Sequence, residues 1–211
     1  MLISIHYNYT YHKQPIAVRE KLREYFEQDL SLSKDVEEVV NAFEHVVIDK
    51  NDYLFNAGST IDHYYILEEG FVRSFAIDTK GNDITTHFFS KGEIVIDWPA
   101  FFMHQKTSEY YQAMTKCSAW RLGFDRFQEL FHSIADFREA GRTRLVGSYF
   151  VMKNRNIEMI TKSAKERYET LFRQHPEVIK NASLKHIATL LGITDTSLSR
   201  IRKEMASGSV S

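Results

Sequence analysis

The sequence predicts an α+β protein: an N-terminal jelly roll of short strands, then a long helix, then a C-terminal helix-turn-helix. Three observations predict this order. Aromatic and β-branched runs alternate with turn residues between Val46 and Gly123. A helical pattern without proline extends from about Ala135 to Ile160. The stretch HIATLLGITDTSLSRIRK, residues 186–203, contains two short helical patterns that meet at a single glycine.

The segment before the strands, from about Ile16 to Phe43, predicts helices. In AVREKLREYFEQDL the apolar residues recur at helical spacing. In the following SLSKDVEEVVNAF we expect Ser33 to be the N-cap, because Glu37 and Glu38 follow in the first turns. We assign these helices to an N-terminal domain, residues 1–134.

The strands are predicted by four β-rich runs: VVIDKNDYLFNAG, HYYILEEGFVRSFAID, NDITTHFFSKGEIVID and YYQAMTKCSAWRLG. Gly58, Gly70, Gly81 and Gly92 punctuate these runs at intervals of 11 to 12 residues. The segment 78–82, DTKGN, predicts a hairpin turn, because Gly81 accepts a positive φ at little cost. Regularly spaced short strands are typical of a sandwich or jelly roll.

The long helical pattern predicts a helix of nearly 40 Å, at ~1.5 Å rise per residue. A helix of this length with apolar residues on more than one side usually packs against a partner. We therefore predict a dimerisation helix over residues 135–161; the alternative is a helix docked wholly on its own β domain. The apolar positions are Leu145, Val146, Tyr149, Met152, Ile157 and Ile160.

The net charge of −1 conceals a division of charge along the chain. Residues 1–141 contain 14 Lys and Arg against 22 Asp and Glu, a balance of −8, and residues 142–211 contain 13 against 6, a balance of +7. Such asymmetry is typical of a basic partner-binding module attached to an acidic domain, and a polyanion is the leading partner. The alternative is a chance excess of Lys and Arg in the C-terminal helices.

The third predicted domain, residues 162–211, begins at the break near Thr161, where Ser163 can cap the helix AKERYETLFRQH before Pro176 ends it. Further on, Ala188 is small where two helices would cross, and Gly192 suits the left-handed end of the first helix. Thr194 can cap the second helix. These are the requirements of a helix-turn-helix whose second helix enters the DNA major groove. A plain αα-hairpin is the alternative.

The second helix offers candidate contacts to double-stranded DNA. Arg200 can bind guanine O6 and N7 bidentately, the commonest specific base contact. The remaining candidate base contacts are Asp195, Thr196 and Ser197, near the helix N-terminus. Asp195 either accepts from a cytosine amine or complements the helix dipole. Candidate phosphate contacts, which contribute affinity and salt dependence, are Lys185, Ser199, Arg202 and Lys203.

Composition excludes several other classes of protein. Cys117 is the single cysteine, so the chain forms no internal disulfide and holds no iron–sulfur cluster with four of its own thiolates. No apolar run approaches the roughly 20 residues of a membrane span. The opening MLISIHYNYTYHKQP lacks the features of a signal peptide, and a cytoplasmic protein is expected. We expect Cys117 to be a small buried apolar residue; a redox sensor is the alternative.

The nine histidines raise the question of a metal site. A cupin enzyme also uses a jelly roll but needs a His-x-His with a downstream Glu and His. Here His87 is followed by two phenylalanines, and His63, His104 and His132 are dispersed. We therefore expect no metal, no catalytic residues, no cofactor and no enzymatic activity; nothing singles out an axial ligand for haem.

Taken together, the chain resembles the Crp/Fnr superfamily of bacterial transcription regulators from roughly Ser31 to Met205. The resemblance rests on YLFNAGS, YYILEEGFVRSF, KGEIVID and HIATLLGITDTSLSRIRK, and the stretches SAKERYETLFRQHPE and GITDTSLSRIRKEM look most like Bacteroidetes-type members. The resemblance implies a cyclic-nucleotide-binding-like β-roll, a homodimer, a DNA-binding C-terminal domain, a palindromic operator and RNA polymerase as a further partner. The alternative function is a ligand-binding protein-interaction module without sequence-specific DNA binding.

Two departures from the family concern the effector. Ile96 and Asp97 align with the Gly-Glu pair of cyclic-nucleotide-binding relatives, and Thr107 aligns with their phosphate-binding arginine, with Glu109 close by. A carboxylate repels a phosphate, so binding of cyclic AMP is not expected. Trp98, Phe101, Phe102, Tyr110 and Tyr111 form either an apolar pocket for an unknown effector or a filled core. The candidate effector residues are Ile96, Asp97, Trp98, Thr107, Ser108 and Tyr110.

In the recognition helix, Arg200 falls on the family's base-reading arginine. The family's other readers, an arginine and a glutamate near the helix start, are replaced by Asp195 and Thr196. The DNA sequence that this chain recognises is therefore expected to differ from the family's usual target.

Overall fold

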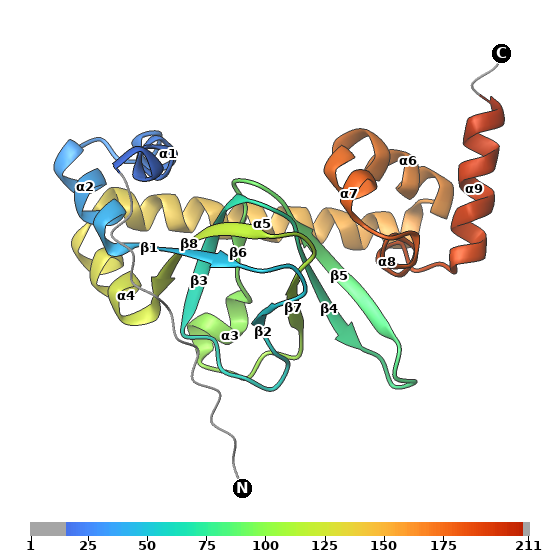
Figure 1. Ribbon diagram of the computed structural model, residues 1–211, viewed down its shortest axis with the longest axis horizontal. Helices are drawn as coiled ribbons and strands as arrows, with labels where there is room; N and C mark the ends of the chain where they lie inside the picture. Colours follow the sequence, from blue (N-terminus) through green and yellow to red (C-terminus); the bar gives the residue numbers. More distant parts are fainter. Residues whose placement is uncertain (1–15, 209–211) are drawn as a thin grey trace, which may run out of the picture.

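The computed structural model describes residues 16–208. A β-roll occupies the middle of the molecule and a group of helices lies at each end (Figure 1). The long helix α5, Ala135–Thr161, runs along the β-roll and connects the two ends. Among the described residues, no helix combines the length and the apolar character that crossing a bilayer requires.

Between residues 16 and 208, eight strands form two four-stranded antiparallel sheets in the orders β1-β8-β3-β6 and β2-β7-β4-β5. All four β-rich runs of the sequence are thereby confirmed as strands. Their bounds are β1 Glu44–Ile48, β2 Tyr53–Phe55, β3 His63–Glu69, β4 Val72–Ile77, β5 Asp83–Phe89, β6 Ile94–Val95, β7 Tyr110–Ala113 and β8 Cys117–Gly123.

The turn between β4 and β5 is the one that the sequence predicts. Asp78 Oδ1 accepts hydrogen bonds from the amides of Lys80 and Asn82, both at 2.8 Å. Gly81 has a φ of 82°, in the left-handed region. The short side chain of Asp78 and the freedom of Gly81 together close this hairpin.

Two helices precede the strands: α1, Ile16–Glu27, and α2, Ser33–Ala42. The prediction that Ser33 caps α2 is wrong. Leu32 holds the N-cap position without a side-chain cap, and the amides of Asp35 and Val36 donate to its carbonyl. Just before the helix, Asp136 from α5 accepts from the Ser31 amide at 3.0 Å.

A short helix that the sequence does not predict, α3, Trp98–Met103, follows β6. Asp97 caps it by accepting from the Ala100 amide at 3.1 Å. After β8 comes α4, Phe124–Ser133, whose Phe127 and Leu130 pack into the domain core.

Helix α5 has two differently packed parts. Its first turns are docked on the β-roll, where Phe137 and Ala140 are buried. Its remaining length leaves large apolar side chains exposed, so it is not docked wholly on its own domain. These exposed side chains are Leu145, Val146, Tyr149, Phe150, Val151, Met152, Ile157, Met159 and Ile160.

The C-terminal helices are α6, Ala164–Gln174, α7, Pro176–Asn181, α8, Leu184–Leu190, and α9, Asp195–Gly208. Ser163 caps α6 in a capping box with Glu166, as predicted. Pro176 occupies the first turn of α7, where its missing amide hydrogen costs nothing. The first and third predicted domains include residues 1–15 and 209–211, which lie outside the described residues. The domain boundaries at 134/135 and 161/162 stay predictions.

Candidate functional site

Helices α8 and α9 meet in a tight turn. Ala188 is 0% exposed at their crossing, and the amide of Ile193 donates back to its carbonyl at 3.0 Å. Gly192 has a φ of 68°, a conformation that side chains with a Cβ rarely adopt. Leu198 and Ile201 of α9 are buried against α8 and α6. The predicted helix–turn–helix geometry is therefore present.

The opposite side of α9 faces solvent. Thr194 caps the helix by accepting from the Ser197 amide at 3.2 Å. Thr196, Arg200 and Lys203 are exposed at positions i, i+4 and i+7, which places them on one stripe. The Arg200 side chain is 77% exposed, and the nearest carboxylate, Glu204, lies 3.9 Å away. Since exposed pairs at this spacing contribute little, the guanidinium is free to contact another group.

The other candidate contacts border this stripe. Asp195 is exposed in the first turn, where its charge complements the helix dipole, while Ser197 and Ser199 are half-buried. Arg202 is exposed on the flank of α9. Lys185 is exposed in the first turn of α8, two residues after the N-cap Ser183. The structure thus brings the cations of α8 and α9 to one end of the molecule.

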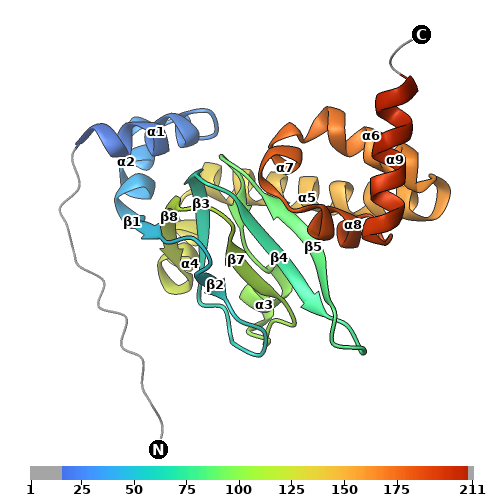
Figure 2. The ribbon, with the colours of Figure 1, turned by 45° about the vertical axis from the view of Figure 1, so that its right-hand side comes forward.

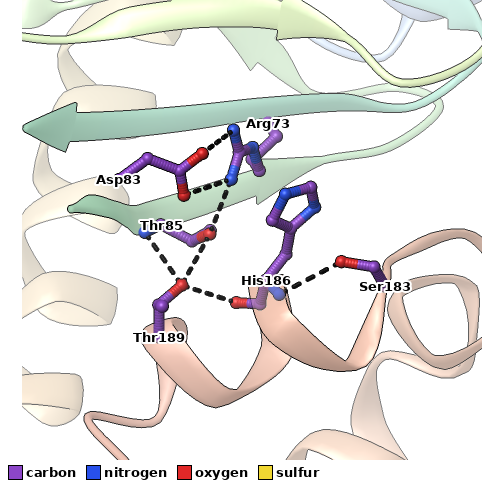
Figure 3. Close-up of polar contacts among 6 residues, drawn as sticks. All are labelled: Arg73, Asp83, Thr85, Ser183, His186 and Thr189. Atoms are coloured by element: carbon purple, nitrogen blue, oxygen red, sulfur yellow. Dashed lines mark hydrogen bonds and ion pairs between the residues drawn. The ribbon is translucent and has the colours of Figure 1, made fainter. Parts of the chain in front are cut away.

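Helix α8 also packs against strand β5 of the β-roll (Figures 1 and 2). The Thr189 hydroxyl accepts from the Thr85 amide at 3.2 Å. It lies 3.1 Å from both the Thr85 hydroxyl and the His186 carbonyl, to one of which it donates (Figure 3). Beside it, Phe71 and Phe88 from the β-roll join the apolar core of the C-terminal helices. The two ends of the molecule are therefore in direct contact.

An ion pair in the β-roll lies next to this contact. The Arg73 guanidinium, 2% exposed, donates to both carboxylate oxygens of Asp83 at 3.0 Å and to the Thr85 hydroxyl at 3.3 Å (Figure 3). His186 of α8 lies beside it; burial, together with the Arg73 charge, lowers the pKa of His186. A neutral imidazole there avoids a second positive charge next to Arg73.

Sequence reasoning missed a residue that joins three elements at this contact. Arg155, from α5, donates to the carbonyl of Thr86 in β5 and, at 3.2 Å, to the carbonyl of Leu190 in α8. No clear signal in the sequence marks this role, because Arg155 stands among other polar residues, Lys153, Asn154 and Asn156. Arg167 makes a second such link by donating to the carbonyls of Lys162 at 2.6 Å and Leu191 at 2.8 Å.

The polar residues that the sequence reading aligns with the family's nucleotide-binding positions hydrogen-bond to one another. The Thr107 hydroxyl donates to Asp97 at 2.6 Å and accepts from the Glu109 amide at 3.1 Å. The Tyr111 hydroxyl donates to Glu109 at 3.0 Å, and burial next to that carboxylate raises the pKa of Tyr111. The carboxylates of Asp97 and Glu109 thus accept hydrogen bonds from neutral hydroxyl groups. The charge at these positions is negative rather than positive.

The other candidate effector residues separate in space. Tyr110 stacks on Phe75 with ring centroids 5.1 Å apart, and Ser108 is exposed in the loop before it. Ile96 and Trp98 instead face a cavity on the other side of the sheet β1-β8-β3-β6. The aromatic residues that the sequence groups together therefore belong to two different places.

The remaining candidates are Cys117 and the groups of side chains that could bind a metal. Cys117 is 1% exposed, and burial raises the pKa of its thiol, as expected of a packed apolar residue. Within residues 16–208, His, Cys, Asp and Glu side chains do not gather in any group of three suited to a metal ion.

Comparison with known proteins agrees with this architecture. The family described as cyclic nucleotide-binding domain matches residues 45–133. Search of the curated proteins found no significant match. FixK2 from Bradyrhizobium japonicum superposes with a TM-score of 0.69 at 13% identity, covering 80% of this chain and 86% of that chain.

Two further solved structures extend the likeness. A candidate transcriptional regulator of the Crp/Fnr family from Eubacterium rectale has a TM-score of 0.68 at 11% identity, covering 88% of each chain. The c-di-GMP-responsive regulator CLP from Xanthomonas campestris has a TM-score of 0.65 at 15% identity, covering 85% of this chain and 94% of that chain. Residues 45–133 therefore match the family of cyclic nucleotide-binding domains, and the chain as a whole has the fold of the Crp/Fnr transcription regulators.

Proposed function

We propose that this protein is a homodimeric, sequence-specific DNA-binding transcription regulator of Crp/Fnr type that does not respond to cyclic AMP. The observation that carries the proposal is the exposed stripe of Thr196, Arg200 and Lys203 on a capped second helix. Its side chains combine a bidentate base reader with a phosphate-neutralising cation. The carboxylates of Asp97 and Glu109 at the family's phosphate position argue against cyclic AMP.

Selection of genomic fragments by the purified full chain tests this function. A dimer that places two recognition helices in successive major grooves should enrich a palindrome with half-sites roughly 34 Å apart. The bound fragments are sequenced and the affinities of the enriched site and a scrambled site compared. Equal affinities would favour the alternative, a protein-interaction module that binds DNA only through charge.

A heptad stripe on α5 supports the dimer. Val146, Phe150, Lys153, Ile157 and Ile160 follow the spacing of four and three residues that defines a two-helix seam. Phe150 is 56% exposed and Ile160 85% exposed. Burial of the four apolar members of this stripe, all but Lys153, against the same helix of a second copy removes apolar surface from water.

We expect Phe150→Glu to convert the dimer into a monomer, because a carboxylate at the seam would face its own symmetry mate in an apolar interface. Light scattering at micromolar concentration measures the change. Val151→Glu is the matched control: Val151 is 60% exposed, next to Phe150, but lies off the heptad stripe. A Phe150→Glu protein that stays dimeric, or a monomeric wild type, contradicts the assignment of the seam.

We further propose that regulation changes how the C-terminal helices sit on the β-roll, by movement about the joint 161–163. Helix α5 ends at Thr161, and Lys162 is extended, with φ −101° and ψ 144°. Contacts of Thr189 and Arg155 hold the C-terminal helices against β5 on the far side of this joint. An effector that favours one arrangement over another needs only a difference in affinity between the two.

Thr189→Val tests this contact. The substitution keeps the side-chain shape but leaves the Thr85 amide without its acceptor, a loss of about 1–3 kcal/mol for a buried group. We expect trypsin to cleave after Lys162 roughly fivefold faster or more, because the undocked population rises by that factor. Thr189→Ser keeps the hydroxyl and should be cleaved at the wild-type rate. Equal rates for the valine and serine variants would show that the contact does not restrain the joint.

A further inference from the structure

We propose that a cavity between the outer face of the sheet β1-β8-β3-β6 and helices α1, α4 and α5 binds a small amphiphilic carboxylate, an acyl or aryl acid. The lining of this cavity includes Ile96 but none of the polar residues aligned with the family's nucleotide position, Asp97, Thr107 and Glu109. On β3, Tyr64 contacts Phe127 of α4 across the outer face, whereas its neighbour Tyr65 contacts Phe55 inside the β-roll. The cavity lies on the Tyr64 side.

The cavity has the size and the walls for such a ligand. Its volume is about 200 Å³. An engineered apolar cavity of about 150 Å³ holds benzene, so this one accommodates roughly a ring with a short chain, or an eight-carbon chain. The walls are nearly entirely apolar, and among the side chains that form them are Ile66, Ile94, Ile96, Trp98, Phe102 and Phe131.

A glycine inside α5 keeps part of this space open. Gly141 lines the cavity in a helical segment, although glycine weakens a helix relative to alanine. A Cβ built there would meet the Phe131 ring at 3.6 Å, which is ordinary van der Waals contact. The packing therefore accepts a side chain at this position, and one longer than a methyl group would extend into the cavity. The missing side chain leaves room for an occupant.

The positive charge of the arginines among the lining residues favours an acidic ligand. Among the lining residues, the charged side chains are Arg142 and Arg144. Arg144 is committed to Asp29 and to the Tyr25 ring, whose centroid lies 5.0 Å from its guanidinium carbon. Arg142 pairs with Glu139 three residues away, and both side chains are more than 60% exposed. An exposed pair of this kind is weak, so the Arg142 fork can turn to a carboxylate whose chain fills the cavity.

The apolar walls also exclude the family's ligand class. A nucleotide needs hydrogen-bonding partners for its base and sugar, and burial of those polar groups without partners is unfavourable. A ligand with an apolar chain or ring and one charged end can keep that end at the cavity mouth, so that none of its polar atoms is buried. Because the walls come from the sheet and from α1, α3, α4 and α5, an occupant would bridge the β-roll and the first turns of the long helix.

Octanoate and its neutral amide, octanamide, test the proposal on the full chain. Trp98 lines the cavity and is one of two tryptophans, so its fluorescence reports binding, with calorimetry as a second measurement. We expect octanoate to bind at least fivefold more tightly than octanamide. Arg142→Gln should remove that preference, whereas Arg126→Gln, on the outer side of α4, should keep it.

Filling the cavity is the complementary test. Gly141→Leu should abolish binding of both compounds; Gly147→Leu, on the same helix with no atom near its added Cβ, should leave binding unchanged. Ile94→Phe fills the cavity from the sheet and serves if Gly141→Leu fails to fold. The proposal is overturned if folded wild-type protein binds neither compound at millimolar concentration, if a filled variant binds as wild type does, or if Arg142→Gln retains the preference.

Discussion

Arg200→Ala is expected to weaken binding of the operator by at least about 30-fold, because each bidentate guanine contact contributes about 1–3 kcal/mol and a dimer loses two of them. The side chain is 77% exposed on the outer stripe of α9 and packs against nothing in the domain core. The substitution should therefore leave folding intact. It should also relax the preference for the guanine position rather than weaken all sequences equally.

Fluorescence anisotropy with the enriched site, at one fixed salt concentration, measures this loss. Lys203→Ala is the informative comparison, because a lost phosphate contact weakens all sequences alike and lowers the slope of log affinity against log salt by about 1 per subunit. Arg126→Ala, on α4 at the far end of the molecule, should bind as wild type does. If Arg200→Ala binds the enriched site as tightly as wild type, Arg200 does not read a base.

Asp83→Asn is expected to lower the free energy of unfolding by about 3 kcal/mol at neutral pH, the lower end of the range for breaking a buried ion pair. Arg73 is 2% exposed and would keep its charge without a countercharge. The lower end of the range applies because the Asp83 side chain is 27% exposed and water reaches it. Since Arg73 also donates to Thr85, the same substitution should loosen the surface on which α8 rests.

The pH dependence gives this prediction a second measurement. Hydrogen bonding to the Arg73 guanidinium holds the pKa of Asp83 below its usual value. A carboxyl group with a lowered pKa stabilises the folded state above its unfolded pKa of about 3.9, and this stabilisation disappears as the pH falls through the folded pKa. The difference between wild type and Asp83→Asn should thus be constant near neutrality and shrink below about pH 4.

Urea unfolding at pH 7 and at pH 3 checks both statements. Asp49→Asn is the control, because Asp49 is 77% exposed and lies 4.0 Å from Lys116, so its loss should change stability little. An Asp83→Asn protein as stable as wild type at pH 7 would mean that Arg73 is stabilised by other groups.

Much of the fold could be predicted because its signals are local. The alternation of apolar residues predicts the strands, and the turn at Asp78 and Gly81 follows from two residues whose conformational preferences act within five positions. The same holds for α5 and for the bend at Gly192. The errors lie where local signals are weak. Helix α3 has six residues, too few for a periodic pattern, and α2 begins after Leu32, an apolar N-cap that no capping preference predicts.

The candidate site divides in the same way. The exposed stripe of α9 follows from helical periodicity, because burial of Leu198 and Ile201 forces Arg200 outward. The pairing of Asp97 with Thr107, the pairing of Arg73 with Asp83, and the link from Arg155 to β5 and α8 join residues that no local pattern relates. Amphipathic order along the chain specifies which residues turn inward. Which of the inward-facing and polar groups contact one another depends on how the sheets and helices pack. Those contacts join segments more than a hundred residues apart in the chain.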